Sequence, residues 1–177
     1  MKKRHFLKSG TAFLGAFSLG QALSGCSQAV ADTEPAVVNP RVPKPELATF
    51  EITKTEEEWR EILSPKAFGV LREHKTEAPH SSPLDKNYTA GTYSCAGCDL
   101  PLYSSETKFN SGTGWPSFYD ALENAVGTSV DRSFLMTRTE VHCRRCGGHL
   151  GHVFNDGPQP TGKRHCINGV ALSFTAA

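Results

Sequence analysis

The sequence has no long, uninterrupted apolar run. Its most apolar stretch, from Thr11 to about Ser24, is short and broken by glycine and serine, which excludes a stable membrane-spanning helix. Strong net charge is also missing, since 19 basic against 18 acidic residues give +1. Removing the four basic residues before Cys26 gives −3, which argues against nucleic acid as the main partner. Internal repeats are absent too, and the roughly 130 residues from Phe50 onward suffice for one domain with one core.

The N-terminus has the pattern of an export signal. No acid occurs among the first eight residues, whereas four are basic: Lys2, Lys3, Arg4 and Lys8. A basic segment followed by a short apolar segment is typical of a secretory signal. The segment from Lys3 to Lys8 also resembles a twin-arginine transport signal, with lysine in the place of the first arginine.

The signal offers two alternative endings. Leu23-Ser24-Gly25-Cys26 resembles a bacterial lipobox, in which the cysteine is lipidated and becomes the mature N-terminus. Ala29-Val30-Ala31 is a site for ordinary cleavage, and Cys26 is then discarded with the signal. We favour the lipobox because Cys26 directly follows the apolar run. The prediction is an exported protein tethered to the membrane by lipid, facing the periplasm or the cell exterior. A soluble periplasmic form cleaved at Ala31 is the alternative.

A proline-rich segment separates the signal from the folded part. Between Asp32 and Ala48 the chain has little apolar content and four prolines: Pro35, Pro40, Pro43 and Pro45. Such a composition predicts an extended tether. The predicted organisation is therefore an export signal at 1–25, a tether at 26–48 and one folded domain at 49–177.

Local patterns in the domain predict two short helices followed by strands. Thr55 and Glu58 form a capping box before apolar residues at helical spacing, and Ser64-Pro65 begins a second helix through Leu71. Short apolar runs between turns predict strands at 92–94, 133–136, 140–142, 152–154 and 170–174. The expected fold class is mostly β, with short N-terminal helices and an antiparallel core of two sheets.

Four cysteines form two C-x-x-C pairs that predict a closed, structural zinc site. The ligands are Cys95, Cys98, Cys143 and Cys146. Zinc binds four thiolates in a tetrahedron, and neighbouring glycines let the backbone curl around the ion. Residues 99–142 separate the pairs, far more than the ~15–20 residues of a simple zinc ribbon. The pairs would therefore join distant parts of the domain. A disulfide or a redox dithiol is the alternative in an exported protein, and His149 and His152 are possible replacement ligands.

Cys166 is a candidate nucleophile because of its neighbours. A reactive thiol needs positive charge or hydrogen-bond donors nearby to favour the thiolate. Arg164 and Asn168 lie two residues to either side of Cys166 and share its face if the segment is a strand. For the cysteine taken alone, a small buried apolar residue is the alternative interpretation.

Two further segments carry candidate site residues. His149, His152 and Asp156 lie in a glycine-rich segment, where two histidines and an acid can supply and orient protons. A turn with satisfied polar side chains is the alternative there. Trp115 lies between Gly114 and Pro116, which would hold an indole face at a loop as an apolar wall. A buried core tryptophan is the alternative.

Taken together, the motifs resemble the methionine-R-sulfoxide reductase family of the B type, from about Trp59 to Phe174. Both C-x-x-C pairs occur in the family's order with G-W-P-S-F at 114–118, H-L-G-H-V-F-x-D-G-P at 149–158 and P-T-G-x-R-x-C-x-N at 160–168. The resemblance implies an oxidoreductase that reduces methionine-R-sulfoxide in proteins or peptides to methionine. The reaction would pass through a sulfenic acid on Cys166.

The resemblance also implies a role for each site residue. Cys166 is the nucleophile, and the ring of Trp115 receives the S-methyl group of the substrate. Arg164 and Asn168 orient the site and tune Cys166. The sulfoxide oxygen is stabilised and protonated by a cluster of three residues: His149, His152 and Asp156. The family fold, mostly β with short helices, agrees with the local patterns.

Two positions depart from the family's pattern. Many members carry a second cysteine between the glycines before G-W-P-S-F, whereas this chain has Thr113, and His165 stands where an aromatic residue is common. With four cysteines on zinc and Cys26 on lipid, no resolving thiol remains. We therefore expect a thioredoxin-like protein to reduce the sulfenic acid, with a small thiol as the alternative.

Two other function classes remain open from the sequence. A zinc-ribbon-like binding module would explain the cysteine pairs, but not the Arg-x-Cys-x-Asn segment or the two histidines. A disulfide-exchange protein would use the pairs as redox dithiols and bind no zinc.

Overall fold

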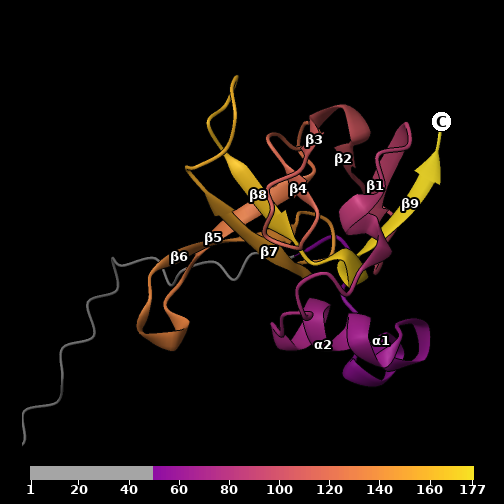
Figure 1. Ribbon diagram of the computed structural model, residues 1–177. Helices are drawn as coiled ribbons and strands as arrows, with labels where there is room; N and C mark the ends of the chain where they lie inside the picture. The colour runs from indigo at the N-terminus through magenta and orange to yellow at the C-terminus, as the bar shows by residue number, and fades with distance from the viewer. Residues whose placement is uncertain (1–49) are drawn as a thin grey trace, which may run out of the picture. The chain divides into compact units, whose positions relative to one another are not determined.

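The structure is a computed structural model that describes residues 50–177 (Figure 1). The predicted signal at 1–25, the tether at 26–48 and the lipidation candidate Cys26 lie outside the described residues. Within residues 50–177, no helix has both the length and the apolar character needed to cross a membrane.

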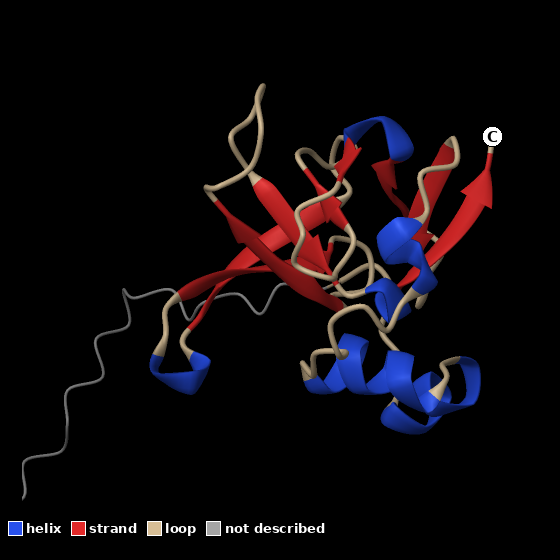
Figure 2. Cartoon of the chain, viewed as in Figure 1, coloured by secondary structure: helices blue, strands red, loops and turns tan. Residues whose placement is uncertain are grey.

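Both predicted helices form, and both begin where the capping residues predict. At α1 (Glu56–Ile62), Thr55 Oγ1 accepts from the Glu58 amide at 3.3 Å, and Glu58 Oε2 accepts from the Thr55 amide at 2.7 Å. α2 (Pro65–Glu73) begins after Ser64, whose hydroxyl accepts from the Ala67 amide. It runs two residues beyond the predicted end and stops at His74, which has φ 54°. Figure 2 shows the two helices together at one side of the strands.

The strands form two antiparallel sheets, which confirms the expected fold class. The smaller sheet has the order β2-β1-β9, with β1 (Gly91–Cys95), β2 (Pro101–Ser104) and β9 (Leu172–Ala176). The larger sheet has the order β3-β4-β8-β7-β6-β5. Its strands are β3 (Lys108–Phe109), β4 (Ser117–Phe118), β5 (Val126–Asp131), β6 (Arg138–Cys143), β7 (His149–Phe154) and β8 (Arg164–Ile167). Single 3-10 turns lie between these elements: η1 (Pro83–Lys86), η2 (Ser105–Thr107), η3 (Ser133–Leu135) and η4 (Gly169–Ala171).

The strand predicted at 133–136 is wrong, because this segment forms η3 at the tip of the β5–β6 hairpin. Leu135 has φ 59° there and is fully exposed, so its side chain does not pack on the core. The strand predicted at 170–174 is correct only from Leu172, since the residues before it form η4. Apolar runs this short do not distinguish a strand from a 3-10 turn.

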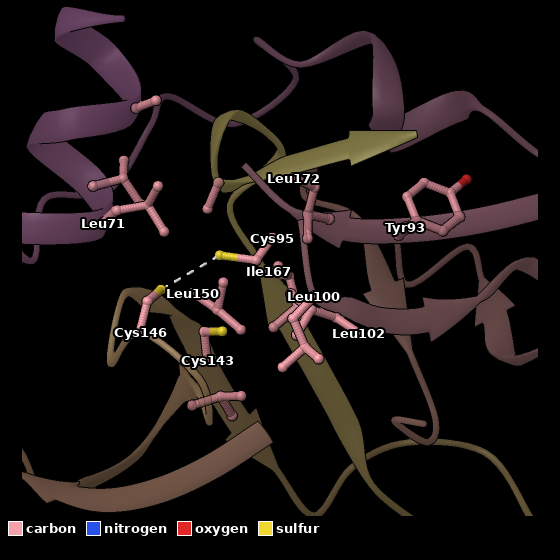
Figure 3. Close-up of a cluster of buried hydrophobic side chains, with 14 of the residues drawn as sticks. Leu71, Tyr93, Cys95, Leu100, Leu102, Cys143, Cys146, Leu150, Ile167 and Leu172 are labelled. Atoms are coloured by element: carbon pink, nitrogen blue, oxygen red, sulfur yellow. Dashed lines mark hydrogen bonds between the residues drawn. The ribbon is translucent and has the colours of Figure 1, made fainter. Parts of the chain in front are cut away.

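The core lies between the two sheets and is closed by α2. Its fully buried side chains come from both sheets, and Leu71 covers them from α2 (Figure 3). Phe118 stacks on Tyr103 at a centroid distance of 4.3 Å and meets the edge of Tyr93 at 5.0 Å. Aromatic pairs of this kind add to the free energy of burial, and they fix the larger sheet against the smaller one.

Strand register aligns a row of polar residues across the larger sheet. Cys166 on β8 pairs with Ser117 on β4 and with His152 on β7, and His152 pairs with Glu140 on β6. Residues directly opposite each other on neighbouring strands share a face of the sheet. The register therefore places Cys166, His152 and Glu140 side by side.

A β-bulge in β7 brings the second histidine to the same face. Residues three apart on a regular strand point to opposite faces, so His149 and His152 would be separated. Here Val141 pairs with Gly151 but His142 pairs with His149, so β7 contains one extra residue. The bulge restores both imidazoles to one face, with ring centroids 5.4 Å apart.

Candidate active site and metal centre

The two C-x-x-C pairs meet at one point, as predicted. Cys95 Sγ lies 3.7 Å from Cys146 Sγ, and Cys98 Sγ lies 3.5 Å from Cys143 Sγ. Both separations are far longer than a disulfide bond of about 2.05 Å. Zinc–sulfur bonds of about 2.3 Å in a tetrahedron would place the sulfurs ~3.8 Å apart. The cysteines of residues 50–177 are all free thiols, and these four fit a tetrahedral metal ion.

Both pairs use the same turn. The residue after each second cysteine has positive φ, 57° at Asp99 and 68° at Gly147. The Asp99 amide donates to the Cys95 carbonyl at 2.8 Å, and the Gly147 amide donates to the Cys143 carbonyl at 2.9 Å. This shared conformation turns the two sulfurs of each pair toward one centre, in the manner of a zinc knuckle.

The four thiols also fit a cation on electrostatic grounds. Hydrogen bonding with the neighbouring thiols raises the pKa of Cys95 far above its ordinary value and lowers the pKa of Cys143 far below it. Four adjacent thiolates would repel one another, so all four ionise together only when a metal ion compensates their charge. The donor set and its spacing therefore suit a structural metal, with no open coordination position.

Several predicted site residues meet at a second place, a small cavity at the face of the larger sheet. Its volume is about 140 Å³, and it is lined by Thr76, Trp115, Arg138, Gly151, His152, Phe154, Cys166 and Asn168. The structure thus brings together four of the residues selected from the sequence: Trp115, His152, Cys166 and Asn168. A thiol, an indole and an imidazole share one space that admits a small group.

The Cys166 thiol is partly covered, and its surroundings act in opposite directions. Burial raises the pKa of Cys166 above its ordinary value, while the Thr113 hydroxyl and the Arg164 charge counteract that rise. Thr113 Oγ1 lies 3.9 Å from Cys166 Sγ. Arg164 is held beside the thiol by two hydrogen bonds to Asp156, both 2.9 Å long. The balance of these effects favours the neutral thiol.

Asp156 lies apart from the two histidines with which the sequence grouped it. Its side chain is 63% exposed and forms an ion pair with Arg164. The bidentate contact keeps the pKa of Asp156 below its ordinary value. Asp156 thus contacts the guanidinium that faces Cys166, and it does not line the cavity.

Trp115 and Asn168 are both held by the backbone of Glu77. The Trp115 Nε1–H donates to the Glu77 carbonyl at 3.1 Å, and the Glu77 amide donates to Asn168 Oδ1 at 3.0 Å. Asn168 Nδ2 donates to the Leu150 carbonyl at 3.0 Å, so this buried carboxamide has partners on both sides. Since Asn168 follows the last residue of β8, it lies beyond the strand that the sequence argument assumed.

His152 is coupled to a carboxylate that the sequence argument missed. His152 Nε2 lies 2.8 Å from Asp131 Oδ2, and Asp131 also accepts from Arg138 at 2.6 Å. Hydrogen bonds, first of all from the Ser133 amide, hold the pKa of Asp131 well below its ordinary value. Burial lowers the pKa of His152, partly offset by Asp131. Asp131 is thus a fixed anion beside the imidazole.

His149 is coupled to a second missed carboxylate. Its Nδ1 lies 2.7 Å from Glu140 Oε1, and Ser129 donates to the other Glu140 oxygen. The contact with His149 lowers the pKa of Glu140 to about 2, so Glu140 is ionised at neutral pH. His149 Nε2 is buried without a hydrogen-bond partner among residues 50–177. The imidazole therefore has one unused polar atom beside the ring of His152.

A sequence signal for Asp131, Arg138 and Glu140 did exist. All three lie within or next to short runs with β-type alternation, on the N-terminal side of the predicted metal ligands Cys143 and Cys146. Charged residues that alternate along a strand beside a candidate site can point into it, whereas on the far face they would be solvated. The pairing register of the strands decides which face of the sheet these side chains occupy, and the sequence alone does not give that register.

The fold and these two sites define a thiol-based oxidoreductase whose two sheets meet at a cluster of four cysteines suited to a structural metal ion. A family model described as the SelR domain matches residues 63–176, and the chain belongs to this family. Relatives named peptide methionine sulfoxide reductase MsrB align over most of both chains. The one from Methanosarcina mazei is 53% identical over 130 residues, covering 73% of this chain and 93% of the relative.

Similar values hold for other relatives with the same name. The protein of Leptospira interrogans is 49% identical over 126 residues, covering 71% of this chain and 96% of the relative. The protein of Agrobacterium fabrum is 47% identical over 130 residues, covering 73% and 96%. Among solved structures, the Mis18 "Yippee-like" domain matches at a TM-score of 0.41 and 21% identity, covering 50% of this chain and 97% of that one. A structural likeness of that size has no bearing on function.

Proposed function

We propose that the protein reduces methionine-R-sulfoxide in proteins or peptides to methionine. The observation that carries this proposal is the cavity of about 140 Å³, which combines the Cys166 thiol, the Trp115 indole and the His152 imidazole. A methyl sulfoxide has an apolar methyl group, an electrophilic sulfur and a basic oxygen. The cavity offers one complementary side chain for each. The names of the MsrB relatives support the same substrate class.

The chemical step needs an acid and a thiolate in one cavity. A sulfoxide sulfur is a poor electrophile until its oxygen accepts a proton. The Cys166 thiolate attacks the sulfur of the protonated sulfoxide and forms a sulfur–sulfur bond. The oxygen then transfers to Cys166, as the sulfur–oxygen bond of the substrate and the new sulfur–sulfur bond both break. One thiolate, one sulfoxide and one proton thus yield methionine and Cys166 sulfenic acid. Only one configuration at sulfur places methyl, oxygen and side chain correctly, and the family resemblance indicates the R epimer.

The proton comes from the histidine side of the cavity. His152 lines the cavity and is held by Asp131, so it is the group placed to bind the sulfoxide oxygen. His149 and Glu140 lie behind it and complete the polar surroundings. Arg164, fixed by Asp156, faces the thiol and favours its ionisation. Trp115 receives the S-methyl group, and Asn168 ties β8 to β7 beside Cys166.

The catalytic cycle closes with an external thiol. Thr113 is the side chain within 4 Å of Cys166 Sγ at the position where many family members carry a second cysteine. The other four cysteines among residues 50–177 cluster with one another at the proposed metal centre, so none of them is assigned as a resolving thiol. A first external thiol displaces hydroxide from the sulfenic acid, which leaves as water, and a second thiol releases Cys166 as the donor is oxidised to a disulfide. A thioredoxin-like protein is the proposed donor.

The four-cysteine centre is proposed to hold one structural zinc ion, through Cys95, Cys98, Cys143 and Cys146. A binding module without catalysis would need this centre but not the cavity. The Cys166→Ser variant separates the two functions, since it should lose reduction of the R epimer and keep one zinc per chain. Full activity in this variant would refute the role of Cys166.

The cellular location is also a proposal and depends on the N-terminal sequence alone. We propose export followed by lipidation at Cys26, with cleavage after Ala31 as the alternative. The intact mass of the mature protein decides between the two, because lipidation and cleavage site both alter it. A mature chain that begins at residue 32 without lipid would overturn the anchor.

A further inference from the structure

A second group of metal-binding side chains lies outside the four-cysteine centre. It consists of His74, at the C-terminal end of α2, Glu140 on β6 and His149 on β7. One potential ligand atom from each residue lies within 4.8 Å of the others. Two histidines and a carboxylate are a donor set that suits zinc, copper, nickel and iron.

The two imidazoles converge on one carboxylate oxygen. Glu140 Oε1 lies 3.1 Å from His74 Nδ1 and 2.7 Å from His149 Nδ1. The rings lie next to each other, with centroids 5.0 Å apart. Ligands bonded to one ion at ~2.0–2.2 Å lie at about such separations, so small rotations suffice for coordination.

The cluster opens into a large cavity with an entry path from solvent. This cavity has a volume of about 490 Å³ and adjoins the smaller one that Cys166 lines, with which it shares Thr76, Arg138 and His152. His74 is 64% exposed at its rim, whereas His149 is buried at its base. The other charged groups that line it are Glu73, Asp131, Arg132 and Arg138. Arg138 is paired with Asp131, which leaves the carboxylate of Glu140 as the buried anion at the two imidazoles.

We infer that His74, Glu140 and His149 form a second, open binding site for a divalent transition metal ion, and that occupation of this site inhibits the enzyme. The inhibition rests on the proposed function, in which His149 and Glu140 complete the polar surroundings of His152. An ion that binds Glu140 and His149 would take both side chains away from His152. With three protein ligands the site keeps room for water, unlike the closed four-cysteine centre. It therefore binds more weakly and reversibly.

Zinc stoichiometry tests the site independently of activity. Protein with its four-cysteine centre loaded is titrated with Zn²⁺ by calorimetry, in the Cys166→Ser background so that the active-site thiol does not bind the ion. One further zinc per chain is expected. His74→Asn should weaken this binding at least about tenfold, because loss of a residue that merely supports a metal ligand already costs about 10–100-fold in affinity. Asparagine tolerates the positive φ at this position.

His80→Asn is the matched control. His80 is also exposed, at 62%, also has positive φ, 62°, and lies 3.4 Å from a carboxylate, that of Asp85. It should retain the second zinc. Absence of a second zinc in the parent protein, or equal binding by His74→Asn, would overturn the site. Thermal melting of both variants excludes misfolding as the cause.

Inhibition is measured in a single turnover without external thiol, because thiols themselves bind zinc. Added Zn²⁺ should slow methionine formation by the parent protein and by His80→Asn, and a chelator should restore the rate. His74→Asn should resist the ion while keeping the basal rate. Zinc binding without this pattern would refute the inhibition and leave the proposed reductase function intact. If the parent protein forms no methionine even without added Zn²⁺, the reductase function and the inhibition both fail, whereas the zinc site is still decided by calorimetry.

Discussion

At the scale of single residues, the reactivity of Cys166 depends on competing influences on its thiol. Burial raises its pKa, and the hydroxyl of Thr113 and the charge of Arg164 lower it. A buried thiol without such neighbours would be an inert core residue. Reactivity here is therefore a property of the neighbours, and each neighbour can be removed separately.

Removal of the Arg164 charge should make Cys166 harder to ionise. In Arg164→Gln the pKa of Cys166 rises further above its ordinary value, so less thiolate is present at neutral pH. The rate of alkylation by iodoacetamide at pH 7 should fall several-fold and recover at higher pH. Lys163→Gln, which removes an exposed charge from the adjacent residue, serves as control and should leave the pH profile unchanged. An unaltered profile in Arg164→Gln would show that the guanidinium does not act on the thiol.

Thr113 is close enough to Cys166 to convert the enzyme to an internal resolving mechanism. Its Oγ1 lies 3.9 Å from Cys166 Sγ, so a thiol at this position would reach the proposed sulfenic acid on Cys166 by side-chain rotation. In Thr113→Cys, one turnover should end in an intramolecular disulfide, seen by peptide mapping, with the loss of two titratable thiols. Ser111→Cys is the control, since Ser111 contacts Thr113 and Ser117. If a sulfenic-acid probe labels both variants equally, the proposed geometry is wrong.

At the scale of elements, the sequence predicts helices and knuckles well because their signals are local. The capping residues Thr55 and Ser64 specify where α1 and α2 begin, and each C-x-x-C pair specifies its own turn. The sequence does not predict register, and the site depends on it. The bulge before Gly151 decides that His149 and His152 share a face. Gly151 permits this arrangement, because a Cβ there would collide with the Cys166 carbonyl.

Nearness in sequence also does not indicate which acids contact the two histidines. Asp156 is near the histidines in the chain, but it contacts Arg164 across the turn between β7 and β8. Asp131 and Glu140 are further away in sequence and reach the histidines from neighbouring strands. Contacts between strands depend on pairing of distant segments, which local patterns do not encode.

The segment between α2 and η1 organises the cavity through Glu77. Its backbone holds Trp115 and Asn168, and its carboxylate accepts from the Gly169 and Val170 amides. Glu77→Ala should release η4 and the tryptophan together, lowering kcat/KM about tenfold, chiefly through a higher KM, and shifting tryptophan fluorescence. Glu77→Gln keeps one carbonyl oxygen as acceptor and should have a smaller effect. Equal effects of the two variants would mean that the carboxylate contacts are unimportant.

At the scale of the whole molecule, the four-cysteine centre joins the two sheets. Cys95 ends β1 in the smaller sheet and Cys143 ends β6 in the larger one, and Leu71 of α2 lies beside them (Figure 3). Trp59 and Leu71 also lie near Gly97 in the first knuckle. A metal ion bound there would fix the two sheets and the helices at one point. The cavity lined by Cys166, in contrast to this centre, lies on the larger sheet and is completed by loops.

Loss of the metal should therefore destabilise the whole domain and not only one loop. Structural zinc contributes on the order of 10 kcal/mol in small zinc-folded peptides, and a share of that lowers the melting temperature by ~10 °C or more in a domain of this size. The experiment uses Cys98→Ser in the Cys166→Ser background, so that only the centre differs between the proteins compared. Circular dichroism should show a lower and broader transition, with less than one zinc per chain. The background variant alone should melt like the parent protein, because Cys166 is not a ligand. Equal melting with the zinc absent would mean that the core of Tyr93, Phe118 and Leu150 holds the two sheets together without the ion.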